Sequence, residues 1–298
     1  MQWQGVVPAI TTPLTEDLFV DHGFLAKHAG WLVDQGCTGI VALGSLGEGA
    51  TLTSSEKRAI LETCVAALGD RAPVVAGIAA ASTAEAVALA EDAERLGCKG
   101  LMVLPPYVHK GPWHEVEAHF DAIFTATGLP CMLYNNPIAY GIDVLPEQVA
   151  AFVQRHDNLH AVKESSGDTR RVTAIRALVG DRLAIFVGLD DLVLEGVAMG
   201  AVGWIAGLVN ALPAESVKLF EHARAGEDEQ AFELYSWFLP LLRMDTVPEF
   251  VQLIKLVQGE VGMGSERVRP PRQVVCGTAR EQALAIIAQS LKTRPGME

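Results

Sequence analysis

The chain has 298 residues, a length typical of one large domain or of one domain with an appendage. Half of the residues are hydrophobic and 20% are charged, which excludes an intrinsically disordered chain. The 36 acidic residues outnumber the 23 basic ones, so the net charge is −13 and the pI is near 5.1. This balance argues against nucleic-acid binding, which needs a basic face.

The cysteines and the N-terminus bear on the compartment. An odd number of widely spaced cysteines without a Cys-x-x-Cys pair argues against a disulfide framework or a zinc site, so we expect reduced thiols in a cytoplasmic protein. The N-terminus lacks a basic region followed by an apolar stretch, so no signal peptide is expected. No apolar run reaches the ~20 residues that cross a bilayer. The cysteines are Cys37, Cys64, Cys98, Cys131 and Cys276.

Eight short apolar runs, rich in Val, Ile and Leu, alternate with longer stretches rich in Ala, Glu and Leu. Continuous apolar runs are typical of parallel strands covered on both faces, and the spacing suits one strand plus one crossover helix. This predicts a closed (β/α)8 TIM barrel. The alternative, an open doubly wound sheet, lacks its Gly-x-Gly-x-x-Gly fingerprint. The runs are Val6–Ile10, Gly39–Leu43, Val74–Gly77, Gly100–Leu104, Cys131–Tyr134, Leu159–Lys163, Ala184–Gly188 and Val202–Ala206.

The stretches between the runs are predicted to be helices. Cap-type residues from Ser54 open one helix and Ser82 or Thr83 opens the next, whereas Gly69, Gly97 and Gly180 stand where helices end. After the eighth run we expect four more helices. The first closes a barrel over residues 1–225, and the others form a C-terminal helical extension over residues 226–298. These four helices are Pro213–Ala225, Glu227–Leu242, Pro248–Gly259 and Ala279–Leu291.

The sixth run ends in a candidate nucleophile, at the strand ends where barrels carry their active sites. Alternation places Lys163 on one face with Leu159 and Ala161, and the small alanine leaves room beside an inward amine. Partial desolvation lowers a lysine pKa and frees the amine to attack carbonyl carbons. The alternative is a lysine that reaches water or pairs with Glu164, and for the lysine considered alone this is the preferred interpretation.

Other strand ends carry further candidates. Tyr134 ends the fifth run, and a phenol near an amine can move protons. The glycine-rich residues 44–48 after the second run let backbone N–H groups approach a carboxylate, and Ser45 adds a hydroxyl. Each also has a structural interpretation, as a rim tyrosine and a tight turn. Tyr107 after the fourth run is by default a rim or interface aromatic.

Charged residues elsewhere give weaker signals. Asp190 and Asp191 after the seventh run could bind a metal, but capping of the following helix is preferred. The histidines His109, His114 and His119 have no ligand spacing with acidic partners, so no metal site is assigned. A phosphate-binding barrel is disfavoured, because no helix start closely follows the glycines of the eighth run. Arg267, Arg269 and Arg272 are candidate anion ligands, although a solvated loop or interface rim is preferred.

Together these motifs resemble the dihydrodipicolinate synthase / N-acetylneuraminate lyase family of class I, Schiff-base (β/α)8 enzymes. Residues 44–48 resemble its Gly-Thr/Ser-Thr-Gly-Glu motif and residues 134–137 its Tyr-Asn-x-Pro motif. Residues 163–168 resemble the motif of the Schiff-base lysine, and residues 105–107 resemble Thr-Pro-Tyr-Tyr. The resemblance spans nearly the whole chain and is more specific for the superfamily than for a substrate.

The resemblance implies roles for several residues. Lys163 would form an imine with a 2-oxo acid, Tyr134 would shuttle protons, and Ser45 with the N–H groups of Ser45 and Leu46 would hold the substrate carboxylate. Tyr107 would reach the site of a neighbouring subunit, and a homo-oligomer, commonly a tetramer, is implied. The covalent lysine imine needs no cofactor. Further substrate-binding candidates are Gly47, Asn135, Asn136, Tyr140, Gly188 and Ile205.

Two departures from the family pattern bear on the substrate. Ala139 stands where dihydrodipicolinate synthases carry an arginine for the carboxylate of the aldehyde partner, so a charge-assisted anchor is missing. Leu46 replaces the second hydroxyl residue of the Thr-Thr pair and interrupts the usual relay. Residues 134–141 and the tail 264–272 resemble a narrower branch, Δ1-pyrroline-4-hydroxy-2-carboxylate deaminase of hydroxyproline breakdown.

This branch implies a route in which Lys163 attacks C2 of the cyclic imine and the protonated Schiff base acidifies C3. A base removes the C3 proton, the 4-hydroxyl leaves, and hydration releases ammonia and 2-oxoglutarate semialdehyde. Asn135, Asn136 and Tyr140 are candidates for contacts near the 4-hydroxyl. The alternatives are a 2-keto-3-deoxy sugar-acid dehydratase or aldolase, a dihydrodipicolinate synthase-like lyase, and a non-catalytic barrel that binds a small acid.

Overall fold

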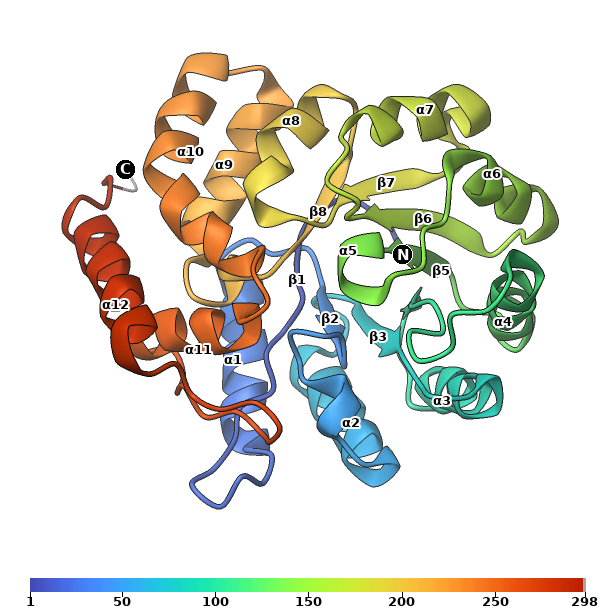
Figure 1. Cartoon of the computed structure of the whole chain (residues 1–298), viewed down its shortest axis with the longest axis horizontal. Coiled ribbons are helices and arrows are strands. Elements are labelled where there is room, and N and C mark those ends of the chain that lie inside the picture. Colours follow the sequence, from blue (N-terminus) through green and yellow to red (C-terminus); the bar gives the residue numbers. More distant parts are fainter. Residues whose placement is uncertain (297–298) are drawn as a thin grey trace.

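Eight parallel strands form a single sheet that curls into a barrel, with helices on its outside (Figure 1). The computed structural model describes residues 1–296. The strands run in the order β1-β8-β7-β6-β5-β4-β3-β2, and a parallel bridge between Ala9 and Val41 joins the two ends of the sheet. The predicted (β/α)8 barrel is confirmed. The strands are β1 (Gly5–Pro8), β2 (Ile40–Ala42), β3 (Val74–Ile78), β4 (Gly100–Val103), β5 (Cys131–Asn135), β6 (Leu159–Glu164), β7 (Ala184–Val187) and β8 (Gly203–Ala206).

The outer helices begin and end where the sequence carries cap residues. In α2, Thr53 and Glu56 form a capping box, so the cap lies one residue before the predicted Ser54. Ser82 caps α3 by accepting a hydrogen bond from the N–H of Glu85. The barrel helices are α1 (His22–Asp34), α2 (Ser54–Leu68), α3 (Thr83–Arg95), α4 (Trp113–Thr125), α5 (Pro137–Tyr140), α6 (Pro146–Arg155), α7 (Arg170–Val179), α8 (Val193–Ala198) and α9 (Pro213–Ala225).

Three helices follow the barrel and lie along one side of it, in the orange and red part of Figure 1. They are α10 (Asp228–Leu242), α11 (Phe250–Glu260) and α12 (Gly277–Lys292), and each predicted helix begins and ends within two residues of them. The short 3-10 helix η5 (Arg243–Asp245) joins α10 to α11 and contacts η3 (Asp190–Leu192) after β7. The C-terminal extension therefore reaches the barrel mouth. No helix in residues 1–296 is long and apolar enough to span a membrane.

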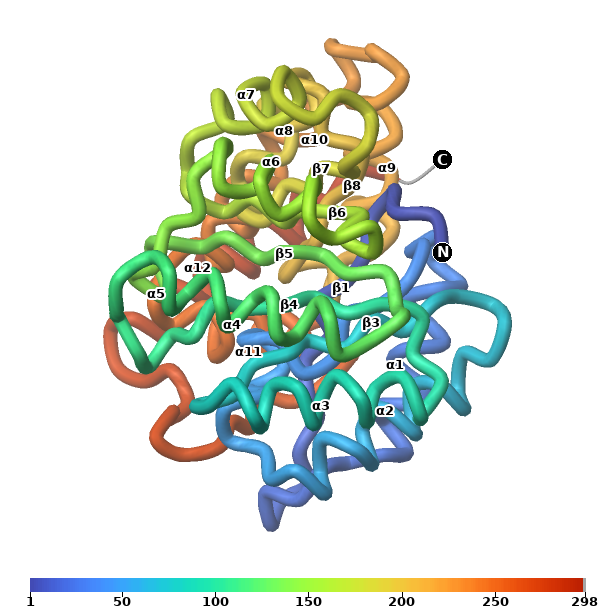
Figure 2. The backbone as a smooth tube through the Cα atoms, turned by 90° about the vertical axis from the view of Figure 1, so that its right-hand side faces the viewer, coloured from blue at the N-terminus to red at the C-terminus, as the bar shows by residue number. Residues whose placement is uncertain are grey.

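Strand register fixes which side chains meet at the mouth. Lys163 of β6 pairs with Tyr134 of β5 on one side and with Phe186 of β7 on the other. Figure 2 views the barrel from the side and shows α5, which follows β5, at the end opposite the N-terminus. The carboxyl ends of the strands thus converge where the sequence motifs predicted a site.

Candidate active site

A cavity of about 620 Å³ opens at the carboxyl ends of the strands. Its walls come from the loops after β2, β7 and β8, from the ends of β5 and β6, from α5, and from the segment around η5. Of the predicted site residues, eight line it: Ser45, Leu46, Tyr134, Asn136, Tyr140, Lys163, Gly188 and Ile205.

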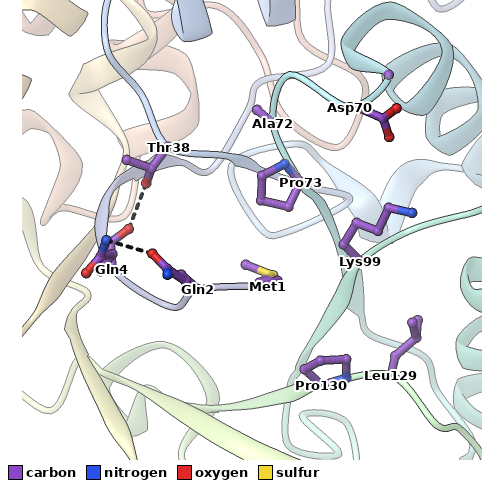
Figure 3. A pocket seen from close by; sticks show the side chains of 11 residues that line it. Met1, Gln2, Gln4, Thr38, Asp70, Ala72, Pro73, Lys99, Leu129 and Pro130 are labelled. Atoms are coloured by element: carbon purple, nitrogen blue, oxygen red, sulfur yellow. Dashed lines mark hydrogen bonds between the residues drawn. The ribbon is translucent and has the colours of Figure 1, made fainter.

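A second cavity, of about 680 Å³, lies at the opposite end of the barrel (Figure 3). Its lining includes Met1, Thr38 and Pro73, and its charged side chains, Asp70 and Lys99, are exposed to solvent. In barrels of this kind the amino-terminal face carries stability and the opposite face carries chemistry. We therefore place the candidate active site in the cavity that contains Lys163.

Lys163 is the central amine of the cavity and is only 6% exposed. Its Nζ lies 4.2 Å from the centroid of the Tyr134 ring, across the face of that ring. Burial lowers the pKa of the Lys163 amine, and the charges of Asp245 and Asp190 oppose this shift. The amine is thus held where a larger share is unprotonated than in an exposed lysine, which is the state that attacks a carbonyl or imine carbon.

Tyr134 presents a buried phenol beside this amine. Burial raises the pKa of the Tyr134 hydroxyl, while the hydrogen bond that Asn136 Nδ2 donates to it, at 3.0 Å, works in the opposite direction. The phenol is therefore protonated at neutral pH and is positioned by Asn136. A neutral phenol next to an amine can donate a proton to a developing carbinolamine and take it back.

The short helix α5 brings a second tyrosine over the glycine-rich loop. Asn136 caps α5 by accepting a hydrogen bond from the N–H of Ala139 at 2.9 Å, and Gly141 ends it with φ +69°. As a result the Tyr140 hydroxyl makes a short hydrogen bond with Ser45 Oγ. Tyr140 thus contributes a hydroxyl where Leu46 lacks one.

The loop after β2 offers unpaired donors to the cavity. The N–H groups of Ser45 and Leu46 donate no hydrogen bond to another described residue, although both residues line the cavity. The flanking residues Leu43 and Glu48 hold φ angles of +67° and +55°, which non-glycine residues rarely adopt. Such free amides next to a serine hydroxyl suit a bound carboxylate.

A buried ion pair with the C-terminal extension anchors this loop. Glu48 accepts hydrogen bonds from Lys255 Nζ of α11 at 2.5 Å and from the backbone N–H of Arg269 at 2.9 Å. Lys255 also donates to the carbonyl of Arg267 at 2.7 Å. The C-terminal extension therefore holds the backbone of the loop that carries Ser45.

Gly188, after β7, makes room for the lysine. A Cβ placed on this residue would lie 1.9 Å from Ser165 Oγ and 2.7 Å from Lys163 Cε. Only a residue without a side chain fits there unless the lysine moves. The predicted candidate Gly188 therefore shapes the position of the amine.

Three predicted site residues lie outside the cavity lining. Asn135 is completely buried and its amide donates to Glu164 at 3.1 Å and to Asp143 at 3.2 Å, so the cavity lining gives no support to its expected contact with the 4-hydroxyl, which stays a prediction. Gly47 is buried in the turn, where its carbonyl accepts from Thr12 Oγ1 at 2.6 Å. Gly47 itself does not line the cavity, although its neighbours Ser45 and Leu46 do, so its substrate contact stays a prediction.

Tyr107 is the third residue outside the lining. Its ring centroid lies 6.1 Å from that of Tyr140 within the same chain. Tyr107 is half-buried, and the neighbouring Tyr140 bonds to Ser45 in the cavity. A role in a neighbouring subunit's site stays a prediction.

The expectation that Asp190 caps the following helix is wrong. Its completely buried carboxylate accepts hydrogen bonds from Trp204 Nε1 at 3.0 Å and from the N–H groups of Gly207 and Leu208. Burial raises the pKa of Asp190 to about 6, against the effect of those hydrogen bonds. Asp190 thus ties the end of β7 to the loop after β8. No metal-ligand cluster occurs among the side chains described.

Sequence reasoning missed Asp245, which lines the cavity from η5. It falls between two predicted helices, in a position that gives no local pattern. Of the three arginines noted in the tail, Arg269 pairs with Glu56, and Arg267 lies 3.4 Å from Glu16. Arg272 alone lines the cavity.

A family model described as the dihydrodipicolinate synthetase family matches residues 2–290. Among curated proteins, 4-hydroxy-tetrahydrodipicolinate synthase of Methanopyrus kandleri is 33% identical over 292 residues, covering 98% of this chain and 96% of the relative. The protein of the same name from Agrobacterium fabrum is 32% identical over 282 residues, covering 95% and 96%.

Solved structures superpose on this chain over nearly its whole length. A dihydrodipicolinate synthase of Bacillus anthracis superposes with a TM-score of 0.93 at 27% identity, covering 99% of this chain and 100% of the other. The enzyme of Acinetobacter baumannii, complexed with pyruvate, gives a TM-score of 0.92 at 28% identity, covering 97% and 99%. These matches cover the strand ends and the C-terminal extension that build the cavity.

Proposed function

Because the chain belongs to the dihydrodipicolinate synthetase family, we propose that it is a Schiff-base enzyme whose substrate is Δ1-pyrroline-4-hydroxy-2-carboxylate. Lys163 Nζ attacks C2 of the cyclic imine, and the resulting protonated Schiff base withdraws electrons from C3. Loss of the C3 proton and of the 4-hydroxyl follows, and hydration releases ammonia and 2-oxoglutarate semialdehyde. The reaction needs no cofactor besides the lysine imine.

The groups around Lys163 support the first part of this route. Tyr134 exchanges the proton of the carbinolamine, since its phenol lies beside the amine and is held by Asn136. The N–H groups of Ser45 and Leu46, with the Ser45 hydroxyl, receive the substrate carboxylate. One carboxylate then has a defined binding place next to the reacting carbon.

The observation that carries the choice of substrate is the loss of the arginine at the position of Ala139. Besides Lys163, the charged side chains that line the cavity are the carboxylates of Asp191 and Asp245 and the guanidinium of Arg272. A second substrate carboxylate beside the two aspartates would meet like charges, which costs binding free energy, and Arg272 is the one lining guanidinium that could offset this cost. A substrate with one carboxylate and a hydroxyl group suits this wall better, because a hydroxyl can donate to a carboxylate.

The test is an ammonia-release assay on the pyrroline acid, with Lys163→Ala as the matched control. We expect the wild type to release ammonia and the variant to lose at least ~1,000-fold in rate, since the covalent step is gone. In parallel, 2-keto-3-deoxyarabonate tests for sugar-acid dehydration. Turnover of that acid without ammonia release from the pyrroline acid would contradict the deaminase proposal.

A second candidate is condensation of pyruvate with aspartate semialdehyde, as the names of the relatives suggest. Arg272 favours it, because its side chain lines the cavity and makes no ion pair with any residue from 1 to 296. In that case Arg272→Ala would abolish condensation by removing the anchor of the second carboxylate. High condensation activity in the wild type, lost in this variant, would replace the deaminase proposal.

A further inference from the structure

Asp245 brings an unengaged carboxyl group into the cavity from the C-terminal extension. A Cβ placed on Gly207 would lie 1.9 Å from Asp245 Oδ1, so the carboxyl rests directly on the backbone that follows β8. Lys163 and Asp245 line the same cavity and each shifts the pKa of the other through its charge. The carboxyl therefore lies within electrostatic reach of the reacting amine.

The other acidic groups near Lys163 already have partners. Asp190 accepts three hydrogen bonds from N–H groups, and Glu164 accepts from Asn135 and from the N–H of Ser166. Asp191 lies 3.9 Å from the guanidinium of Arg243. Asp245, by contrast, makes no side-chain hydrogen bond or ion pair within residues 1–296.

The phenols of the cavity are also engaged. The Tyr134 hydroxyl accepts from Asn136, and the Tyr140 hydroxyl bonds to Ser45. Neither leaves an ionised oxygen at neutral pH, because burial raises the pKa of each phenol. A base that acts at the carbon next to the Schiff base is thus best supplied by a carboxylate.

We propose that Asp245 is the catalytic base that removes the C3 proton of the lysine-bound substrate and then delivers this proton to the departing 4-hydroxyl. Only the second step, in which the 4-hydroxyl leaves, rests on the proposed function. In the first half the C3–H bond breaks, the proton bonds to Asp245, and the electron pair forms C2=C3, leaving a neutral enamine nitrogen.

In the second half the enamine nitrogen re-forms C2=N⁺ and the C2=C3 pair becomes C3=C4. The C4–O bond breaks as the Asp245 carboxyl gives its proton to the leaving oxygen, which departs as water. The carboxylate ends as it began, so proton and electrons balance without another reagent. One group suffices because C3 and C4 are adjacent.

The surroundings of Asp245 suit a group that both takes and gives a proton. Burial and the negative charges of Asp190 and Asp191 raise its pKa well above the usual range of a carboxyl, and the Lys163 charge lowers it. A raised pKa makes the carboxylate a stronger base and its acid form a ready proton donor. After the imine forms, its positive charge replaces that of the ammonium and favours the ionised carboxylate.

The experiment separates imine formation from proton removal by using pyruvate as the probe. Borohydride reduction with pyruvate reports the imine at Lys163, and exchange of the pyruvate methyl protons in heavy water, followed by NMR, reports proton removal at C3. We expect Asp245→Asn to keep the borohydride adduct while the exchange rate falls at least ~100-fold. The control Asp17→Asn removes the same charge at an exposed position outside the cavity and should exchange within about twofold of wild type.

The possible results have distinct meanings. Wild-type exchange in Asp245→Asn would overturn the proposal and return the proton transfer to Tyr134. Loss of the adduct in Asp245→Asn, or wild-type imine formation without exchange, would overturn it as well. If exchange depends on Asp245 but the wild type releases no ammonia from the pyrroline acid, the base assignment stands and the proposed substrate is wrong.

Discussion

Gly188 determines how closely the end of β7 can approach the reactive lysine. In Gly188→Ala the new methyl group would overlap Ser165 Oγ, at 1.9 Å, and Lys163 Cε, at 2.7 Å. Because the Lys163 side chain must shift by about an ångström, we expect imine formation with pyruvate to slow by about 100-fold. The rate of borohydride-trapped adduct formation measures this effect.

A second glycine provides the comparison. Gly30 lies inside α1 and a Cβ there would meet nothing within 4 Å, so Gly30→Ala should leave the trapping rate unchanged. A normal trapping rate in Gly188→Ala would mean that the lysine has other room to move, and would contradict the tight fit.

The Lys163 amine should also show its burial in a pH profile. Burial lowers its pKa below the ordinary 10.5, so the free amine becomes abundant at lower pH than in an exposed lysine. We expect the rate of imine formation with pyruvate to rise with pH and to level off with a midpoint below 10.5. Asp245→Asn removes a charge that raises the Lys163 pKa and should move the midpoint further down.

Borohydride trapping across a pH series measures both profiles. A wild-type midpoint at or above 10.5 would show that the amine is solvated, and an upward shift in Asp245→Asn would show that the carboxyl does not act on it.

For single residues, the sequence predicted site positions only where a reactive side chain stands at the end of a strand. Lys163 and Tyr134 stand at strand ends, and strand register then makes them neighbours. Asp245 does not follow a strand. Its neighbours, the backbone after β8 and the amine of Lys163 on β6, are distant from it in the sequence. The contact of Tyr140 with Ser45 depends on the single turn of α5, which is too short for a periodic pattern.

Whole elements were easier to predict, because burial on both faces gives each strand a continuous apolar run. The run Val202–Ala206, for example, became β8, and the predicted helix Pro213–Ala225 is α9 with the same bounds. The prediction for Asp190 was wrong because it used local sequence alone. Its position before a helix is typical of a cap, but its carboxylate accepts hydrogen bonds from the N–H groups that follow β8.

The junction between the extension and the loop after β2 leads to a prediction at this scale. Glu48 and Lys255 form a buried ion pair, with both side chains 2% exposed. In Lys255→Met the Glu48 carboxylate loses its charged partner, and we expect a loss of about 3–5 kcal/mol in the free energy of unfolding. Because Glu48 holds the Ser45 loop, the KM for the substrate should rise as well.

The double variant Glu48→Gln, Lys255→Met serves as the control, since it leaves no buried charge. Urea unfolding should show that it regains part of the stability lost in Lys255→Met. If the single variant is as stable as wild type, the pair does not hold the loop.

At the scale of the whole molecule, the family resemblance implies assembly into a homotetramer. Val108 and Ile138, near Tyr107 and Tyr140 in the sequence, are 66% and 71% exposed, and a subunit interface formed there would cover them. We predict a mass in sedimentation experiments near four times the 31.9 kDa of the chain.

Assembly also decides where Tyr107 acts, and mixing two defective variants tests this. Lys163→Ala lacks the amine, and Tyr107→Phe keeps it but lacks the hydroxyl. If Tyr107 serves a neighbouring subunit's site, reassociation of the two variants creates sites with both groups, about a quarter of all sites on random mixing. The mixture should then gain activity that neither variant has alone.

The mixture gains no activity if Tyr107 acts within its own subunit. Within one chain the Tyr107 ring lies 6.1 Å from Tyr140, whose hydroxyl bonds to Ser45, so Tyr107 could instead support the cavity of its own subunit. In that arrangement no mixed assembly unites an intact Lys163 with an intact Tyr107, and the mixture stays as inactive as its parts. Ammonia release, or exchange of pyruvate protons, measured before and after reassociation distinguishes the two arrangements. A Tyr107→Phe variant with full activity would remove the residue from the site altogether.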